Sequence, residues 1–395
     1  MNTCPCRLVR VNVASEAYFQ VVDMMTAPMF YFVTCQPAAQ QVAKREIAKK
    51  CVSWRLSFSK PGFLTFKTDQ SLPHGKIPPL VFSRVCGRSL GRVTGQLGEL
   101  AAATWDRVSA SQHLSELEPR SDAFGPGYAA LHIWHPQTAH VGKEKRVELD
   151  QLVVESRKAL QSAAPPEYKS LALSDEKVLP RRGRQKILDC IVMDSGQWWI
   201  GTHCMSTVPS RYAGGIIPVK TPEVAISRAY YKINEAIAWS RFPLRRGQQC
   251  LDLGSAPGGT SQALLNRGLD VLGIDPAAMD SRVLAHPRFR HLKMRGADIK
   301  RRELAGFQWL ISDMNVAPQF TLDAVQDIVT HSKVHVKGML LTIKLLDWDL
   351  ADQIPEYLNR VRSWGYRDVR ARQLVGNGQE ICIAALQRSA LRRLG

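Results

Sequence analysis

The sequence predicts an α/β protein in which two small α+β domains precede a Rossmann-like sheet that is mostly parallel, with its last strand antiparallel. Three observations lead to this fold class. From about residue 221, short apolar runs alternate with helical stretches, which is the pattern of a parallel sheet covered by helices. One of these runs, 249–254, leads into a glycine-rich turn that opens a helix. Ahead of residue 221 the strands instead come as tight hairpins, which indicates smaller antiparallel units.

A chain of 395 residues is long for one domain, and two or three are expected. We expect an N-terminal extension over 1–24, a first α+β domain over 25–112 and a second over 113–220, with the larger sheet over 221–395. The polar segment 113–126, which contains Pro and Gly, is the expected linker.

The first α+β unit is expected to contain a helix over 38–51 and strands over 30–34, 54–58, 62–67 and 81–86. The second is expected to contain a helix over 147–163 and strands over 129–134, 186–193 and 198–204. Two of these strand pairs are close enough in sequence to form hairpins. The basic loop that ends at Arg184 is either a phosphate contact or a solvated surface.

The C-terminal elements repeat more regularly. Helices are expected over 224–240, 260–267, 323–336 and 351–363, and strands over 249–254, 270–275, 289–294, 309–313, 339–344, 366–372 and 380–386. The last two strands are joined by a short segment with Gly376, Asn377 and Gly378 at its centre. Such a connection is a hairpin turn, so the final pair should be antiparallel.

The chain carries a net charge of +18, and this charge is spread along it. Residues 1–220 hold 28 Lys or Arg against 18 Asp or Glu, and the remainder holds 25 against 17. A polyanion such as RNA is the natural partner of so basic a protein, the alternative being a merely basic surface.

Nothing in the sequence indicates a membrane or a metal. No run of about 18 apolar residues occurs, and the first 25 residues include Glu16 and Asp23, which makes them a poor signal peptide. The nine cysteines are scattered, and Cys4 and Cys6 are too close for a usual zinc pair. A reducing, cytoplasmic setting is expected, and the sequence contains no signal for an oligomeric state.

A glycine-rich turn follows the first strand of the larger sheet. It runs from Asp252 to Gly259 and includes Gly254, Pro257 and Gly258. A turn of this type places backbone N–H groups against a ligand. It has neither the Gly-Lys-Ser/Thr of a P-loop nor the Gly-x-Gly-x-x-Gly of a dinucleotide site, so it is not a phosphate cradle.

Three acidic residues indicate what this turn binds. Asp252 repels a pyrophosphate and instead suits a cation such as the sulfonium and amino group of S-adenosylmethionine. Asp275 ends the next strand, where an acidic residue is suited to ribose hydroxyls. Asp298 follows the third strand and can accept a hydrogen bond from an adenine amino group. The alternatives are a loop of some other α/β enzyme and, for Asp298, an ordinary surface acid.

Four further charged residues fall where a ligand would bind. Lys232 lies on the helix before the first strand, Asp313 and Lys344 end the fourth and fifth strands, and Glu380 begins the last. Ligands of such sheets bind at the carboxyl ends of the strands, so we expect these side chains to meet beside the glycine-rich turn.

These residues resemble the Lys-Asp-Lys-Glu tetrad of FtsJ-like ribose 2′-O-methyltransferases, and the turn is similar to the S-adenosylmethionine loop of that family. The resemblance covers about residues 221–388. It implies a class I methyltransferase sheet, S-adenosylmethionine as cofactor and Lys344 as general base, positioned and tuned by the other three. The residues that it places at the cofactor are Asp252, Gly254, Ser255, Pro257, Gly258, Gly259, Asp275, Asp298 and Asp313.

Two short segments resemble one bacterial branch of that family. They are Arg372-Gln373-Leu374 and Ser312-Asp313-Met314, and the branch is that of 23S rRNA cytidine 2′-O-methyltransferases with an N-terminal ferredoxin-like domain and a THUMP domain. The resemblance implies that 25–112 is ferredoxin-like and 113–220 THUMP-like and RNA-binding. Large-subunit rRNA is then the favoured partner.

The chemistry agrees with such a tetrad. A ribose 2′-hydroxyl is a poor nucleophile, and a lysine can assist only as a neutral amine or by stabilising the developing alkoxide. We expect like-charge repulsion between the two lysines, together with desolvation, to lower the pKa of one of them.

Two departures bear on the assignment. Thr260 replaces the usual aromatic residue after the loop, and 315–318 does not match the Asn/Asp-Pro-Pro-Tyr pattern of base N-methyltransferases, which favours an oxygen acceptor. A methyltransferase of another RNA, such as a tRNA or an mRNA cap, and a non-catalytic RNA-binding or assembly factor remain alternatives.

Overall fold

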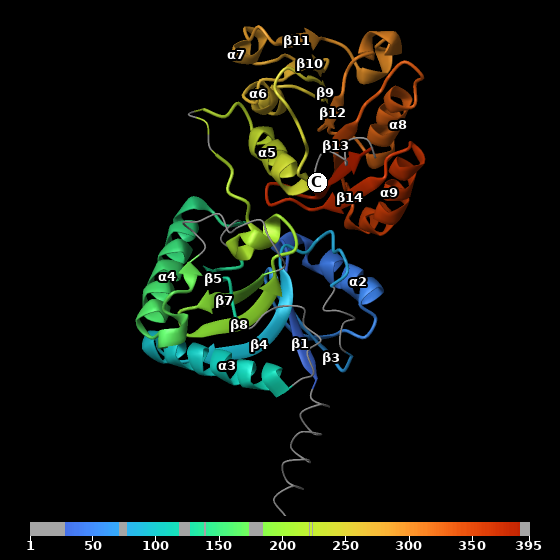
Figure 1. The fold of residues 1–395 in the computed structure, drawn as a ribbon. Helices are drawn as coiled ribbons and strands as arrows, with labels where there is room; N and C mark the ends of the chain where they lie inside the picture. Colours follow the sequence, from blue (N-terminus) through green and yellow to red (C-terminus); the bar gives the residue numbers. More distant parts are fainter. Residues whose placement is uncertain are drawn as a thin grey trace, which may run out of the picture.

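The computed structural model describes residues 28–70, 77–117, 127–137, 140–173, 185–220, 222 and 224–387, and the helices and strands in these ranges build two sheets (Figure 1). The expected N-terminal extension over 1–24, which contains Cys4 and Cys6, lies outside the described residues. So does most of the basic loop that ends at Arg184. None of the described helices has the length and apolar character that a membrane span requires.

The N-terminal sheet has eight strands in the order β2-β3-β1-β4-β8-β7-β5-β6. Their bounds are β1 Met29–Thr34, β2 Arg55–Lys60, β3 Phe63–Thr68, β4 Cys86–Thr94, β5 Ala130–Trp134, β6 Ala172–Leu173, β7 Lys186–Asp194 and β8 Gln197–Cys204. Both expected hairpins, β2–β3 and β7–β8, are present and antiparallel. Strand β4 pairs with β1 on one side and β8 on the other, so the two small units share one sheet.

Within the described residues, the helices that cover this sheet are α2 Gln40–Lys50, α3 Leu97–Leu117 and α4 Lys143–Ser162. Helices α3 and α4 pack together over the β4–β8–β7–β5 part, where Trp105 is buried and its indole N–H donates to the carbonyl of Leu160 at 3.0 Å. Helix α3 continues to Leu117 and so enters the segment expected to be a linker. Helix α2 packs on the other part of the sheet, beside β1 and β3.

The strand expected over 81–86 was wrong, because the strand in this region is β4, which begins at Cys86. Residues 81 and 82 are buried, but their backbone N–H groups donate to the carboxylate of Glu46, at 2.8 and 3.1 Å. A side chain of α2 thus replaces the neighbouring strand that the apolar run predicts.

The C-terminal sheet has seven strands in the order β11-β10-β9-β12-β13-β15-β14. Their bounds are β9 Gln249–Leu253, β10 Asp270–Ile274, β11 Phe289–Leu292, β12 Trp309–Ser312, β13 Gly338–Lys344, β14 Asp368–Arg372 and β15 Glu380–Leu386. Strands β9 to β13 pair in parallel, and β15 is antiparallel to both of its neighbours. The predicted fold class is therefore confirmed.

Helices cover both faces of this sheet (Figure 1). Their bounds are α5 Ala229–Ser240, α6 Gly259–Leu265, α7 Ser281–Leu284, α8 Pro318–Val329 and α9 Ile354–Ser363. Side chains alternate along β9, so that Cys250 packs with the α5 and α6 side and Leu251 with the α8 and α9 side. Short 3-10 helices are η1 Pro37–Ala39, η4 Pro166–Tyr168, η5 Pro209–Arg211, η6 Ala213–Gly215, η7 Gly296–Asp298, η8 Arg301–Leu304 and η9 Trp348–Gln353.

Helix α4 begins at Lys143, before the expected residue 147, and two helices of the C-terminal sheet are displaced further. Helix α5 starts at Ala229 instead of 224, because Gln262 of α6 holds the preceding backbone through the Ile226 N–H, at 3.0 Å, and the Val224 carbonyl, at 2.9 Å. Helix α8 starts at Pro318, before the expected residue 323, since proline is well suited to the first turn of a helix.

Candidate active site

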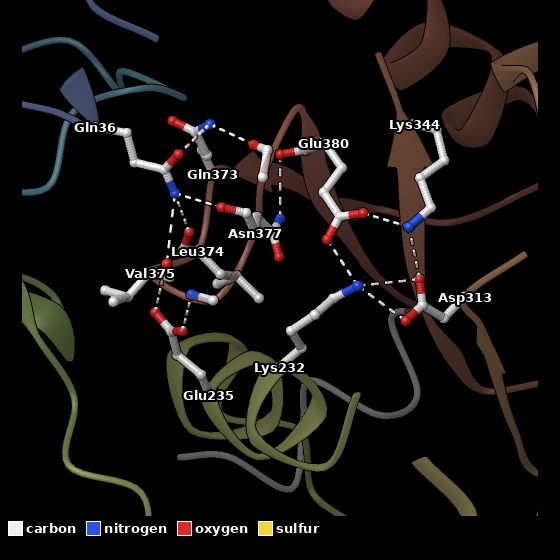
Figure 2. Close-up of polar contacts among 12 residues, drawn as sticks. Gln36, Lys232, Glu235, Asp313, Lys344, Gln373, Leu374, Val375, Asn377 and Glu380 are labelled. Carbon is white, nitrogen blue, oxygen red and sulfur yellow. Dashed lines mark hydrogen bonds and ion pairs between the residues drawn. The ribbon is translucent and has the colours of Figure 1, made fainter. Parts of the chain in front are cut away.

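The four charged residues singled out in the sequence meet at the carboxyl edge of the parallel strands (Figure 2). The Nζ of Lys232 lies 2.9 Å from Asp313 and 2.7 Å from Glu380. The Nζ of Lys344 lies 3.3 Å from Asp313 and also forms an ion pair with Glu380. Each ammonium group thus contacts both carboxylates, and each carboxylate contacts both ammonium groups, which gives a closed and electrically balanced square.

The fold explains why these residues meet. Lys344 is the last residue of β13 and Glu380 the first of β15, and the two are direct partners in the antiparallel ladder. Asp313 follows β12, and its N–H donates to the carbonyl of Leu253 at the end of β9, at 3.1 Å. Lys232 reaches the same point from the first turn of α5. Three strand ends and one helix therefore fix the square.

The lowered pKa expected for one of the two lysines is not that of Lys232. Burial alone would lower it, but Asp313 and Glu380 outweigh that effect, and the pKa of Lys232 lies above its usual value. Asp313 shows the reverse balance, since burial raises its pKa but the two lysines bring it below the usual range. The carboxylates, which the like-charge argument did not count, decide the sign.

Beside the square, the backbone of the predicted cofactor turn lies close to other segments of the same chain. Gly254 has a φ of 77°, and a Cβ there would lie 3.0 Å from the backbone of Met314, next to Asp313. Gly258 has a φ of 123°, and a Cβ there would lie 2.9 Å from the side chain of Val283 in α7. Glycine is required at both positions, because other residues rarely adopt such angles.

The third glycine of the turn has a different role. Gly259 begins α6, and a Cβ on it would overlap the hydroxyl of Ser227 just ahead of α5. The glycine therefore permits close approach of α6 to the start of α5, which carries Lys232. Thr260 follows it, is buried, and lines a small cavity with Lys232 and Asp313.

Asp252 is completely buried beneath this turn. Its Oδ2 accepts a 2.6 Å hydrogen bond from Ser261 of α6, whereas its Oδ1 has no hydrogen-bond partner among the described residues. Burial raises the pKa of Asp252 to about 7, and the nearby carboxylates of Asp313 and Asp275 add to the rise. Buried polar atoms normally have a hydrogen-bond partner. A buried carboxylate oxygen that lacks one is therefore expected where a bound ligand supplies the donor.

The other acidic residues lie around the same edge of the sheet. Asp275 follows β10, and its two oxygens accept from the backbone N–H groups of Ala256 and Ala277, at 3.1 and 2.8 Å. Ser255 is buried and its hydroxyl contacts the sulfur of Met279 at 3.5 Å. Asp298 ends η7 after β11 and is exposed. Their roles at a cofactor remain predictions.

Sequence reasoning missed a second set of polar residues behind the square. Glu235, one turn after Lys232 in α5, and Gln36, after β1, both bind the loop over 373–379 that leads to Glu380 (Figure 2). The glycines of this loop signalled a turn, but nothing in the sequence linked it to Gln36, because that contact arises only from the packing of the two sheets.

The sheet order, the glycine-rich turn after β9 and the charged square together define a class of protein, the α/β methyltransferases. A comparison with family models gives a finer answer: residues 225–350 match the FtsJ-like methyltransferase family. This range includes Lys232, Asp313 and Lys344, whereas Glu380 lies beyond it. Residues 225–350 therefore correspond to an FtsJ-like methyltransferase domain.

Relatives described as ribosomal RNA large subunit methyltransferase M are similar over longer stretches. The one from Hahella chejuensis is 27% identical over 296 residues, which cover 72% of this chain and 69% of the relative. The one from Colwellia psychrerythraea is 29% identical over 191 residues, which cover 44% of this chain and 50% of the relative. For the second relative the match thus spans about half of its length.

Among solved structures, one described as a possible methylase from Clostridium difficile 630 covers 91% of this chain and 98% of its own. Its sequence identity is 9% and the TM-score is 0.33.

Proposed function

We propose that this chain transfers a methyl group from S-adenosylmethionine to a ribose 2′-hydroxyl of RNA, and that its substrate is a cytidine of large-subunit rRNA. The observation that carries the proposal is the balanced square of two lysines and two carboxylates beside the glycine-rich turn. The match to the FtsJ-like family supports the reaction, and the names of the relatives support the choice of RNA.

The residues around the turn fit the proposed cofactor. Bound S-adenosylmethionine would supply an electrophilic methyl group on a cationic sulfur. Asp252, with one unpartnered buried oxygen, suits its positively charged amino-acid end. Asp275 would receive the ribose hydroxyls and Asp298 the adenine amino group, while Gly254 and Gly258 let the turn adopt its positive φ angles.

In the proposed mechanism Lys344 first gives its ion-pair proton to solvent, and as a neutral amine it then takes the proton of the 2′-hydroxyl at its Nζ as that oxygen becomes nucleophilic. Its side chain is the most exposed of the four, at 18%, whereas that of Glu380 is 8% exposed. Asp313 and Glu380 orient this amine, and Lys232 balances their charge so that neither carboxylate is left unpaired in a largely buried site. Alignment of the acceptor oxygen with the methyl group accounts for the rest of the rate acceleration.

The N-terminal sheet is proposed to hold the RNA. The net charge of +18 and its spread over both halves of the chain provide the attraction to phosphates. Structured RNA is recognised mostly through its shape, its phosphates and its 2′-hydroxyls, which suits a separate basic unit placed ahead of the catalytic one.

The test uses tritium-labelled S-adenosylmethionine and ribosomal RNA from cells that lack this protein. We expect label in the RNA, at one ribose, and its loss by about a thousandfold in Lys344→Ala. The matched control is Lys333→Ala, because Lys333 is exposed after α8 and outside the square.

Each outcome has a meaning. Undiminished transfer by Lys344→Ala would eliminate that lysine as base. If label entered tRNA or capped mRNA but not ribosomal RNA, the proposed substrate would be wrong and the labelled RNA would be the substrate. Cofactor binding with no transfer to any RNA would indicate a binding or assembly factor. Mapping of the labelled nucleotide decides whether it is a cytidine.

A further inference from the structure

A polar clasp joins the N-terminal sheet to the loop that carries Glu380 (Figure 2). Gln36 lies directly after β1, is 5% exposed, and sends its side-chain amide into the loop over 373–379. Its Nε2 group donates to the carbonyls of Leu374, Val375 and Asn377, at 3.1, 3.4 and 2.6 Å. One side chain from the N-terminal sheet thus binds three backbone carbonyls of a loop in the methyltransferase domain.

The loop is held through other contacts on the same side. The Nε2 of Gln373 donates to the Oε1 of Gln36 at 3.1 Å and to the carbonyl of Gly378 at 2.9 Å. The backbone N–H of Gln373 donates to the carbonyl of Val81 at 2.8 Å. Arg372 donates to the carbonyl of Arg84 at 2.9 Å. The loop therefore takes its shape partly from residues that precede the methyltransferase domain.

On its opposite side the loop rests on helix α5. The carboxylate of Glu235 accepts from the N–H groups of Val375 and Gly376, at 2.9 and 3.3 Å. Gly376 also lies against the stem of Lys232, where an added Cβ would come within 3.1 Å of Cγ. The loop is thus wedged between Gln36 and the helical turn that supplies one lysine of the square.

The far end of the loop reaches the square directly. The side-chain amide of Asn377 donates to the backbone carbonyl of Glu380 at 3.2 Å, and Asn377 is 5% exposed. The carbonyl of Asn377 is also the one that receives the shortest bond from Gln36, at 2.6 Å. Two hydrogen bonds, one to Asn377 and one from it, therefore connect the N-terminal sheet to the backbone of Glu380.

The N-terminal sheet also contacts the segment that follows Lys344. Helix α2 forms ion pairs with η9 through Arg45 and Asp349, at 3.0 Å, and through Lys49 and Asp352, at 2.9 Å. These pairs are exposed and contribute little to stability. The same docking surface thus reaches the chain next to both Lys344 and Glu380.

We infer that Gln36 is a positioning residue for methyl transfer, through which docking of the N-terminal sheet sets the place of Glu380 and Lys232. The inference rests on the proposed function. It makes the N-terminal sheet part of the catalytic geometry as well as a holder of RNA, because a loop freed from Gln36 would let Glu380 shift while the cofactor turn, which follows β9 and does not contact Gln36, stays in place.

The test compares two variants of the full chain that differ only in where a charge is placed. Gln36→Glu keeps the size of the side chain but turns a carboxylate toward three carbonyl oxygens. Gln41→Glu makes the same change at an exposed position of α2. We expect Gln36→Glu to lower kcat by about 10- to 100-fold, the effect of misplacing a catalytic group by about an ångström. The Kd values for S-adenosylmethionine and for RNA should match those of Gln41→Glu.

The pH profile of kcat separates positioning from general weakening. Glu380 forms ion pairs with both lysines of the square, so a shifted Glu380 changes the charge around the proposed base and moves the midpoint of the profile. A smaller fraction of folded protein lowers kcat by the same factor at every pH and leaves the midpoint in place. If Gln36→Glu does not fold, Gln36→Met removes the same hydrogen bonds without a charge and is expected to lower kcat in the same way.

The outcomes are distinguishable. An inactive wild-type chain would count against the proposed function. An active wild type with equal kcat values and pH midpoints for the Gln36 and Gln41 variants would overturn the inference alone. A Gln36 variant whose only defect is a raised Kd for RNA would also overturn it, since the residue would then serve binding.

Discussion

Ser261 donates a 2.6 Å hydrogen bond to the carboxylate of Asp252, and both side chains are completely buried. The bond joins the end of β9 to helix α6 beneath the glycine-rich turn. It leaves the Oδ1 atom of Asp252 as the buried oxygen to which no described residue donates. In the proposed enzyme this oxygen meets the cationic end of the cofactor.

The first prediction is a pH dependence of cofactor affinity. The pKa of Asp252 is raised to about 7 by burial, so the carboxyl is neutral below that pH and ionised above it. Because a cation binds the ionised form, the Kd for S-adenosylmethionine should fall as the pH rises from about 6 to 8 and then level off. Isothermal titration calorimetry at these pH values measures it.

Asp252→Asn should abolish that dependence and weaken binding by roughly tenfold or more, the value of a hydrogen bond to a charged group. Asp106→Asn, at an exposed site of α3, is the control. A Kd for the Asp252 variant that still followed the wild-type pH curve would show that another group titrates.

The sequence predicted the methyltransferase sheet well because its signals are local. Most of the strands from β9 to β15 are covered on both faces and are therefore short apolar runs of adjacent residues, and the turn at Asp252–Gly259 is marked by its glycines. The square could be predicted because strands of a parallel sheet bring their carboxyl ends to one edge.

Contacts across long distances in the chain were not predictable in this way. Glu46 accepts a hydrogen bond from the backbone N–H of Val81, and Gln262 binds the backbone ahead of α5, so that this helix begins later than expected. Strand β4 joins the two small units in one sheet. Each depends on which surfaces pack together, and none leaves a periodic pattern in the sequence. The sign of the shift in the pKa of Lys232 was not predictable for the same reason, since it depends on the positions of Asp313 and Glu380, which are distant in the chain.

The second prediction concerns the packing of α6 against the start of α5. Gly259→Ala should destabilise the protein by about 1–3 kcal/mol, because the new Cβ overlaps the Ser227 hydroxyl. That hydroxyl is buried and has no hydrogen-bond partner among the described residues. Ser227→Ala in the same chain should therefore restore part of the loss. Urea unfolding measures both effects.

Gly98→Ala is the control, since a Cβ there meets no described atom within 4 Å and the residue lies in helix α3. It should leave stability unchanged or raise it slightly. If Gly259→Ala were equally harmless, or if Ser227→Ala brought no recovery, then the close approach of the two helices would not depend on this glycine.

The third prediction comes from a buried group of ionisable side chains in the N-terminal sheet, formed by His132, Asp189 and His203. The Nδ1 of His203 lies 2.5 Å from Asp189, and its Nε2 lies 2.7 Å from the carbonyl of Ser210. Both ring nitrogens face acceptors, which requires both to carry protons. Burial opposes that charge, but Asp189 outweighs it and raises the pKa of His203.

His132 faces the same pair and behaves oppositely. Its nitrogens have no hydrogen-bond partner among the described residues, and it is 0% exposed. Burial, with a smaller contribution from charged His203, lowers its pKa to about 4, although Asp189 acts in the other direction. The folded state therefore keeps His132 neutral at pH values where the unfolded chain binds a proton.

The sign of the resulting stability change follows from this difference. The contribution of His132 is present above its unfolded pKa of about 6.5 and is lost as the pH falls toward 4, by up to roughly 3 kcal/mol. His203 acts in the opposite direction between pH 7 and about pH 5.5, because its raised pKa keeps it protonated in the folded state while the unfolded chain is still taking up a proton. This contribution is present in both wild type and variant and cancels when the two are compared. His132→Leu should remove this part of the acid destabilisation and cost little at pH 7, since no hydrogen bond is lost. Urea unfolding at pH 7 and pH 5 tests it, and equal losses in wild type and variant would contradict the assignment to His132.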